Sequence, residues 1–593
     1  MLNHPTSGLA SQMDYYIAPV DEETDFLKIT RPEDLKVIDP ACGSGHMLTY
    51  AFDLLYAIYE EEGYSPAEIP GLILTHNLHG TEIDGRAGAL AAFALTMKAR
   101  SRQRTFFNKQ VEPNVCVIEP ISFTPDELDY LVTKDGDRSA EERFWNQFAE
   151  ADTLGALIQP DPGLTVRLAR HVETLDDGGD MLRADSLDWA RLAIRQAEYL
   201  SPGYAVVVAN PPYMGSKQMN DLLSQFMKGE YPTGKSDLMT AFMVRAQGLS
   251  VSGGVWAMIN LPSWMSLKSF EELRQDLLRD QRIVSMVHLG RGVFGSDFGT
   301  VAFVVDNARP GKARGIYRRL FEQHVDVRSV TTIEALFRDS TYNRYEVSQA
   351  DFAAIPGSPI VYWLSEKMRG SFSIGRPLSE VANLRQGLAT ADNNRFLRQW
   401  WEVATSRTAF SCTTREEAAA SEARWFPYNK GGEFRKWYGN QEHVVNWEHD
   451  GQEIIDFKPR SVIRNPGTYF SPSVSWSDIS SGEAAFRRYP QGFIHDSTGH
   501  SGFGDRTMLD QITLLLNSTF VMEVMKVVAP TLHFHIGYVG LVPVAEGIRE
   551  LRTDAVDRLV EASREDWNVA ETAWSFEQNP LVALRSTMGG DLG

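Results

Sequence analysis

The feature that most constrains this chain is an apolar run that ends in a glycine-rich turn and is followed by a helical pattern. Residues 35–38 read LKVI, residues 39–46 read DPACGSGH, and residues 47–59 carry apolar side chains at helical spacing. A second run at 78–83 is followed by an Ala- and Leu-rich stretch at 86–100. Strand, helix, strand and helix in this order predict a mostly parallel sheet with helices on its faces.

The same alternation resumes after a long interruption. Residues 101–179 are acidic and irregular, and they predict a mostly helical insertion. Beyond it we expect strands at 181–184, 205–209, 255–260, 284–289 and 300–305, with helices at 190–198, 238–249 and 270–278. Seven strands with intervening helices predict an α/β fold, a doubly wound and mostly parallel sheet that ends near residue 308.

The chain changes character after a Pro-Gly pair at 310–311. Residues 309–505 are richer in Trp, Arg, Gly and Asn and predict a second domain of mixed α+β structure. Residues 506–593 predict a C-terminal helical region.

Charge and cysteine content exclude several classes of protein. The three cysteines lie far apart and have no paired spacing, which argues against disulfides and against a structural metal site. No early stretch has the pattern of a signal peptide and no segment stays apolar for a membrane span, so we expect a cytoplasmic protein without membrane contact. A net charge of −20 argues against coating nucleic acid with the whole surface, but it leaves room for a local basic cleft.

The first chemical motif is the turn at 39–46 together with the acidic residues after the second strand. Glycines at 43 and 45 let a ligand approach the backbone, and the following helix offers unpaired N–H groups. An acidic residue after the second strand can accept hydrogen bonds from both hydroxyls of a ribose. Glu82 is the better candidate for this role, because Asp84 is also placed to cap the next helix.

The second motif, Asn210-Pro211-Pro212-Tyr213, follows a buried strand directly. Two prolines stiffen the turn and fix the direction of the Asn210 side chain and of the Pro211 carbonyl. Two acceptors beside an aromatic ring fit a planar base that carries an amino group.

These motifs resemble those of S-adenosylmethionine-dependent DNA adenine methyltransferases whose target-recognition domain follows the catalytic one. The resemblance is stronger to the PglX family of BREX phage-defence systems, through the stretches 37–60, 77–100, 288–294 and 385–403. It implies a Rossmann-like class I methyltransferase domain, S-adenosylmethionine as cofactor, no metal, and double-stranded DNA with a flipped adenine as substrate. Other phage-defence proteins are further expected partners. In that family a helical region and a Tyr-Thr-Pro-like motif precede the glycine-rich turn, and we expect this upstream part to be shortened here.

The resemblance also assigns roles to individual residues. It implies that the turn holds the methionine part of the cofactor, that Glu82 holds the ribose, and that Asp185 holds the cofactor's adenine amino group. The target adenine would lie on the Asn-Pro-Pro-Tyr turn, with Phe294 on its other face. The expected cofactor-binding residues are Asp39, Pro40, Ala41, Gly43, Gly45, Glu82, Asp84 and Asp185, and the expected catalytic residues are Asn210, Pro211, Pro212, Tyr213 and Phe294.

Basic residues interleaved with tryptophans predict the DNA-binding surface between 375 and 501. The expected DNA contacts are Arg385, Arg395, Arg398, Arg424, Lys430, Arg435 and Lys436. The alternative for any one of them is an arginine stem packed over an aromatic core. Two other functions stay open: methylation of a protein glutamine, whose amide also presents a planar amine, and a DNA- or partner-binding component with little methyl transfer.

Overall fold

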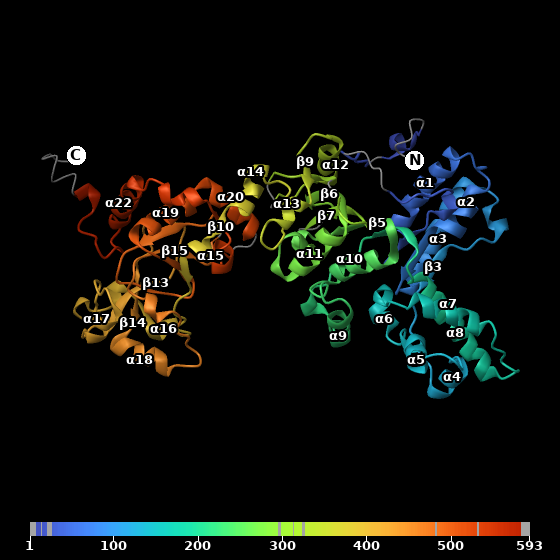
Figure 1. The fold of residues 1–593 in the computed structure, drawn as a ribbon, viewed down its shortest axis with the longest axis horizontal. Coiled ribbons are helices and arrows are strands. Elements are labelled where there is room, and N and C mark those ends of the chain that lie inside the picture. Colours follow the sequence, from blue (N-terminus) through green and yellow to red (C-terminus); the bar gives the residue numbers. More distant parts are fainter. Residues whose placement is uncertain are drawn as a thin grey trace. The chain divides into compact units, whose positions relative to one another are not determined.

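A computed structural model describes residues 7–13, 15–20, 26–294, 298–311, 313–322, 326–480, 483–529 and 533–582. The chain forms two compact units, Met1–Ala353 and Ala354–Gly593, which are treated separately below (Figure 1). The end of the expected C-terminal helical region, residues 583–593, lies outside the described residues.

The described part of the first unit is built on one mixed sheet of nine strands in the order β3-β2-β1-β4-β5-β7-β6-β8-β9. The first five strands of this order, from β3 to β5, are parallel to one another, whereas β7 is antiparallel to both β5 and β6. The strands are β1 (Val37–Asp39), β2 (Leu78–Glu82), β3 (Asn114–Val117), β4 (Tyr204–Ala209), β5 (Ser250–Asn260), β6 (Arg282–Arg291), β7 (Gly299–Asp306), β8 (Arg314–Arg319) and β9 (Arg344–Ser348). The expected α/β class is confirmed by this sheet and its helices.

The helices of the first unit include the predicted ones and a separate helical lobe, in which α7 packs against α8 (Figure 1). They are α1 (His46–Glu61), α2 (Ile69–Leu72), α3 (Gly85–Arg102), α4 (Pro125–Leu131), α5 (Arg138–Asn146), α6 (Ala151–Leu154), α7 (Pro162–Val172), α8 (Met181–Tyr199), α9 (Asp221–Glu230), α10 (Leu238–Leu249), α11 (Glu271–Asp280), α12 (Val330–Arg338) and α13 (Ala350–Ala353).

Three sequence predictions about this unit are wrong. The expected strand at 181–184 is the first turn of α8, which begins there because Asp180 accepts a hydrogen bond from the Leu182 N–H and caps the helix. The expected insertion at 101–179 contains β3, which pairs with β2 and belongs to the sheet. The sheet also does not end at 308, because β8 pairs with β6 and β9 pairs with β8.

One face of the central strands is less covered than the other. Along β5, Trp256 and Met258 are buried, whereas the alternate residues Ala257 and Ile259 are only half-buried. Since side chains alternate across a strand, the half-buried set marks a single apolar face of the sheet.

The described part of the second unit holds two four-stranded sheets and one two-stranded sheet. The first, β11-β18-β15-β16, is antiparallel, and the second, β12-β14-β13-β17, includes one parallel pair. The strands are β10 (Arg376–Pro377), β11 (Asn383–Arg385), β12 (Leu397–Gln399), β13 (Trp425–Asn429), β14 (His443–Asn446), β15 (Ser473–Ser477), β16 (Phe486–Tyr489), β17 (Ile494–His495), β18 (Gly499–Phe503) and β19 (Pro543–Val544).

In the described part of the second unit, five helices precede the last strand of the four-stranded sheets and four follow it. They are α14 (Glu366–Ile374), α15 (Leu378–Val381), α16 (Asn393–Phe396), α17 (Arg415–Ala420), α18 (Glu448–Asp456), α19 (Arg506–Leu516), α20 (Thr519–Val528), α21 (Ile536–Val539) and α22 (Asp554–Asn568). In the described residues no single helix is long and apolar enough to cross a membrane; α19 and α20 together meet the criteria of length and composition, but they are bent by 73°.

Candidate active site

The glycine-rich turn and the Asn-Pro-Pro-Tyr turn follow β1 and β4, the neighbouring strands between which the strand order of the sheet reverses. Strand β1 lies between β2 and β4 and is parallel to both. Its register pairs Val37 with Val206 and Ile38 with Val207, so the turn after Asp39 and the turn after Ala209 leave the same edge of the sheet. Ligands of open α/β sheets bind at such an edge, outside the carboxyl ends of the strands.

The Glu82 carboxylate ties the glycine-rich turn to the end of β2. One oxygen accepts the Gly43 N–H at 2.8 Å, and the other accepts the N–H groups of Ile83 at 2.9 Å and Asp84 at 3.1 Å. A carboxylate offers about four lone-pair positions, so Glu82 keeps acceptor capacity for a ligand hydroxyl.

The glycine-rich turn has a left-handed backbone at two positions. Gly43 has φ +54° and Gly45 has φ +83°, where Gly45 precedes the first residue of α1. A Cβ at Gly45 would lie 3.1 Å from Ala91, whereas a Cβ at Gly43 would meet nothing within 4 Å. Gly43 therefore faces open space, and the first N–H groups of α1 have no side-chain cap.

Asp39 is a buried carboxyl at the base of this turn. It is 2% exposed and accepts the Ala41 N–H at 3.1 Å. Burial, opposed by this hydrogen bond, and the nearby charge of Glu82 raise its pKa to about 7. Desolvation likewise raises the pKa of the adjacent Cys42 thiol, which is buried against β2.

Two predicted cofactor residues lie elsewhere. The Asp84 side chain caps α3 by accepting the Arg86 N–H at 2.8 Å, and its ion pair with the Arg86 guanidinium lowers its pKa. Asp185 is exposed on α8 rather than placed at a strand end. The acidic residue that does follow the third parallel strand is Glu119, two residues beyond β3. No sequence pattern singled out Glu119, because β3 lies within the insertion expected at 101–179.

The Asn-Pro-Pro-Tyr turn follows β4 as predicted. Asn210 and Pro212 are exposed, and Pro211 is buried. The Tyr213 hydroxyl lies 3.1 Å from Asn210 Oδ1 and 2.9 Å from the Ile259 carbonyl oxygen. A phenol carries one hydrogen, so these two acceptors share it and Asn210 Oδ1 keeps acceptor capacity. Burial and the charge of Asp237 raise the Tyr213 pKa to about 12.

The aromatic ring beside this turn belongs to Phe298. Its ring lies edge-on to Tyr213, with centroids 6.0 Å apart, and it is 44% exposed. Phe294, the residue expected from the sequence, is 49% exposed, and no ring contact joins it to Tyr213. Both phenylalanines lie between β6 and β7, so the sequence alone does not distinguish them.

Helix α10 contacts two segments of the site, the one that follows the Asn-Pro-Pro-Tyr turn and the one at residues 156–158. At its start, Asp237 accepts the Met214 N–H at 3.3 Å, and the Leu238 N–H donates to the Met214 carbonyl at 2.9 Å, which fixes the chain just after Tyr213. Near its end, the buried Arg245 donates to the carbonyls of Ala156 at 2.7 Å and Ile158 at 3.0 Å.

The segment held by Arg245 lies against the end of β2. A Cβ at Gly155 would come within 2.7 Å of Ile83, the residue after Glu82. Ile83 is 49% exposed, although it is a large apolar side chain. An exposed apolar surface next to a carboxylate with spare acceptor capacity suits the flat face of a base. In the sequence, Ile83 is marked only by its place between the acidic residues Glu82 and Asp84.

An apolar cavity of about 720 Å³ lies beside the Asn-Pro-Pro-Tyr turn, on the half-buried face of the sheet. It is lined by residues that include Tyr15, Tyr16, Met47, Ala209 and Ile259. Ala209 directly precedes Asn210, and the two tyrosines were not singled out in the sequence.

Six of the seven basic residues expected to bind DNA have partners inside the second unit. Lys430 pairs with the buried Asp496 at 3.1 Å, and Arg435 pairs with Asp566 at 3.3 Å. Arg424 and Lys436 also form ion pairs, whereas Arg395 and Arg398 lie over aromatic rings. Arg385 is exposed on β11 and forms no ion pair within the described residues.

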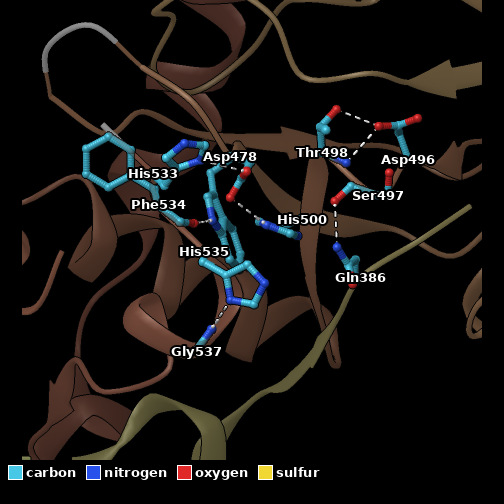
Figure 2. Close-up of polar contacts among 12 residues, drawn as sticks. Gln386, Asp478, Asp496, Ser497, Thr498, His500, His533, Phe534, His535 and Gly537 are labelled. Carbon is cyan, nitrogen blue, oxygen red and sulfur yellow. Dashed lines mark hydrogen bonds and ion pairs between the residues drawn. The ribbon is translucent and has the colours of Figure 1, made fainter. Parts of the chain in front are cut away.

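A network of polar side chains surrounds the ion pair between Lys430 and Asp496. Asp478 accepts from His500 at 3.1 Å and lies 3.2 Å from the His533 ring nitrogen, as Figure 2 shows. In the same view Asp496 accepts the Thr498 N–H at 2.7 Å, and Gln386 donates to the Ser497 carbonyl at 3.1 Å. These contacts give Asp478, Asp496 and Gln386 hydrogen-bond partners within the second unit.

Comparison with known proteins shows that the chain is similar to DNA methyltransferases. Residues 76–294 match the Eco57I restriction-modification methylase family. The adenine-specific methyltransferase PglX of Lacticaseibacillus casei (strain Zhang) is 37% identical over 93% of this chain and 47% of its own length. BrxX of Escherichia coli O9:H4 (strain HS), also an adenine-specific methyltransferase, is 34% identical over 98% of this chain and 50% of its own length.

Among solved structures, the Type IIL restriction-modification enzyme MmeI in complex with DNA matches with a TM-score of 0.47 and 13% identity, over 95% of this chain and 71% of that one. The chain spans about half the length of the curated relatives it matches. The resemblance expected from the motifs is confirmed, and the chain is similar over almost its full length to the PglX and BrxX adenine-specific methyltransferases.

Proposed function

We propose that this chain transfers a methyl group from S-adenosylmethionine to the N6 amino group of adenine in DNA, as part of a phage-defence system. The observation that carries the proposal is the placement of Asn210 beside the glycine-rich turn, on neighbouring parallel strands and at the same edge of the sheet. We further propose that the first unit is a doubly wound, Rossmann-like methyltransferase domain, supported by the reversal of strand order between β1 and β4.

The residues at this edge fit S-adenosylmethionine. Gly43 faces open space, the N–H groups at the start of α1 are oriented for a carboxylate, and Glu82 keeps one acceptor position for a ribose hydroxyl. Ile83 would lie against the adenine of the cofactor, and Asp39 would stabilise the ammonium group of its methionine part. When bound, the cofactor supplies an electrophilic methyl group on a sulfonium.

The methyl acceptor would be held by the Asn-Pro-Pro-Tyr turn. Asn210 Oδ1 and the Pro211 carbonyl would accept the two N–H bonds of the adenine amine, which orients the nitrogen lone pair for in-line attack. The amine nitrogen would take the methyl group that the cofactor supplies and would lose one proton to solvent. Tyr213 and Phe298 would stack on the base, and stacking of roughly 1–3 kcal/mol per base offsets part of the cost of flipping it out.

We propose that the second unit recognises the DNA sequence. Arg385 is exposed and forms no ion pair with a described residue, so it is the member of the predicted basic set most available to DNA. The other six would first exchange an internal ion pair or ring contact for a phosphate.

Methyl transfer from labelled S-adenosylmethionine to DNA tests the proposed function directly. We expect incorporation into N6-methyladenine at a defined sequence, which sequencing of methylated bases in cells that express the chain would identify. Binding of the cofactor without transfer to DNA, together with transfer to a protein substrate, would contradict the DNA assignment.

The raised pKa of Asp39 predicts how the stability of the first unit depends on pH. Between about pH 4 and pH 7 the unfolded chain has lost the Asp39 proton while the folded chain keeps it, so stability falls with rising pH. Asp39→Asn removes this penalty while keeping an acceptor for the Ala41 N–H. We expect the variant to gain up to about 4 kcal/mol relative to wild type across this window, measured by urea denaturation.

Asp84→Asn is the matched control for this prediction. The Asp84 pKa is lowered by its contacts with Arg86, so its stabilisation is lost as pH falls through the folded-state pKa. Across pH 4 to 7 the Asp84→Asn variant should therefore differ from wild type by a constant amount, whereas the difference for Asp39→Asn should grow with pH. Equal trends in both would contradict the assignment of a buried, protonated Asp39.

A further inference from the structure

We infer that Lys217, Lys235 and Lys268 form a phosphate-binding patch beside the catalytic turn, which holds the backbone of the DNA strand that carries the target adenine. This inference rests on the proposed function, since it assigns the contact that would hold the substrate next to Asn210. The three residues are called the edge lysines below.

Hydrogen bonds connect the three segments that carry the edge lysines. The Ser216 N–H donates to the Ser236 carbonyl at 3.0 Å, and an antiparallel bridge joins Gly215 to Asp237. The Ser236 hydroxyl donates in turn to the Ser269 carbonyl at 3.2 Å. Each edge lysine is a chain neighbour of one of these serines, so the fold gathers three cations from segments up to fifty residues apart.

The same contacts attach the edge lysines to the catalytic turn. Lys217 follows Tyr213 by four residues, and Lys235 precedes Asp237, whose carboxylate accepts the Met214 N–H. Lys268 lies in the connection after β5, which is parallel to β4. Connections after parallel strands leave the same edge, so all three lie at the edge where the target base would enter.

The edge lysines lack internal partners. All three are exposed, and none forms an ion pair or side-chain hydrogen bond with another described residue. Some other lysines of the described chain form ion pairs, such as Lys98 with Asp53 at 2.6 Å. The nearby Asp237 carboxylate is already used by the N–H groups of Met214 and Met239.

The chemistry of the patch favours phosphate over bases. Gathered like charges repel one another, and a bound anion removes this cost. A lysine ammonium is a flexible point charge, which suits phosphate oxygens, whereas reading a base edge favours planar side chains that bind through two hydrogen bonds. In a chain of net charge −20, local unpaired cations are also what brings DNA to one edge.

The salt dependence of DNA binding tests this inference. Each phosphate contact contributes about one unit to the slope of log affinity against log salt. We expect each single Lys→Ala change among the edge lysines to lower the slope by about one and the triple variant by about three, on two unrelated DNA sequences alike. The affinity for S-adenosylmethionine should stay at the wild-type value.

Lys36→Ala is the matched control, since Lys36 is exposed and unpaired in the described structure but precedes β1, at the opposite edge of the sheet. It removes the same charge and should leave the slope unchanged. Edge-lysine variants with the wild-type slope, in a chain that does methylate DNA, would overturn the patch. A wild-type chain that binds the cofactor but methylates no DNA would instead overturn the proposed function.

Discussion

Replacing Asn210 by alanine is expected to lower the rate of methyl transfer by about two orders of magnitude or more, with the affinity for S-adenosylmethionine unchanged. Asn210 is exposed at the end of β4, and its Oδ1 is the side-chain acceptor of the turn. Without it the adenine amine would lose one of two acceptors that orient its lone pair. Single-turnover transfer from labelled cofactor measures the rate, and calorimetry measures the cofactor affinity.

Two further variants sharpen this test. Asn210→Asp keeps an acceptor at the same place and should retain more activity than Asn210→Ala. Asn220→Ala removes an amide of the same kind ten residues away, where it caps α9 by accepting the Leu223 N–H at 2.8 Å, and it should leave transfer nearly intact. A wild-type transfer rate in Asn210→Ala would refute the proposed mechanism.

Replacing Gly43 by valine is expected to abolish measurable binding of S-adenosylmethionine. Its Cβ would project into open space at the glycine-rich turn, where the cofactor would approach the backbone. The left-handed backbone, φ +54°, adds strain for a branched residue. Gly45 is a less direct test, because a side chain there would collide with Ala91 and disturb the packing of α1 against α3.

Gly63→Val controls for the strain alone. Gly63 has φ +83°, and a Cβ there also meets nothing within 4 Å, but it lies just beyond the other end of α1. This variant should lose some stability and keep cofactor affinity. Equal cofactor affinity in Gly43→Val and wild type would contradict the placement of the cofactor at this turn.

The parts of the fold with strong local patterns could be predicted from the sequence. The run before Asp39, the turn and α1 are all where the apolar spacing placed them, as are β2, α3 and α10. Each has a pattern long enough to identify strand or helix without its neighbours.

Short or edge elements could not be predicted in this way. Strand β3 has four residues and is defined by pairing with β2, and β9 lies at the sheet edge. The four residues from Met181 could be read as a strand or as a first helical turn, and the Asp180 cap decides between them.

The residues of the candidate site also divide into those that local sequence patterns identify and those that depend on contacts between distant segments. Asn210 and Glu82 could be chosen because each follows a recognisable strand. Phe298 could not be preferred to Phe294, and Arg245 could not be connected to residues 156–158, because both depend on contacts between distant segments. The alternation of basic residues and tryptophans in the sequence also could not reveal that Lys430 is paired with the buried carboxylate of Asp496.

The two attachments of α10 have a thermodynamic consequence. One helix anchors the segment after the Asn-Pro-Pro-Tyr turn through Asp237 and the wall beside Ile83 through Arg245. If occupancy of one subsite shifts this helix, the other subsite must respond, and the two binding equilibria are then linked. Linkage is reciprocal, so any factor by which the cofactor tightens DNA binding must equal the factor by which DNA tightens cofactor binding.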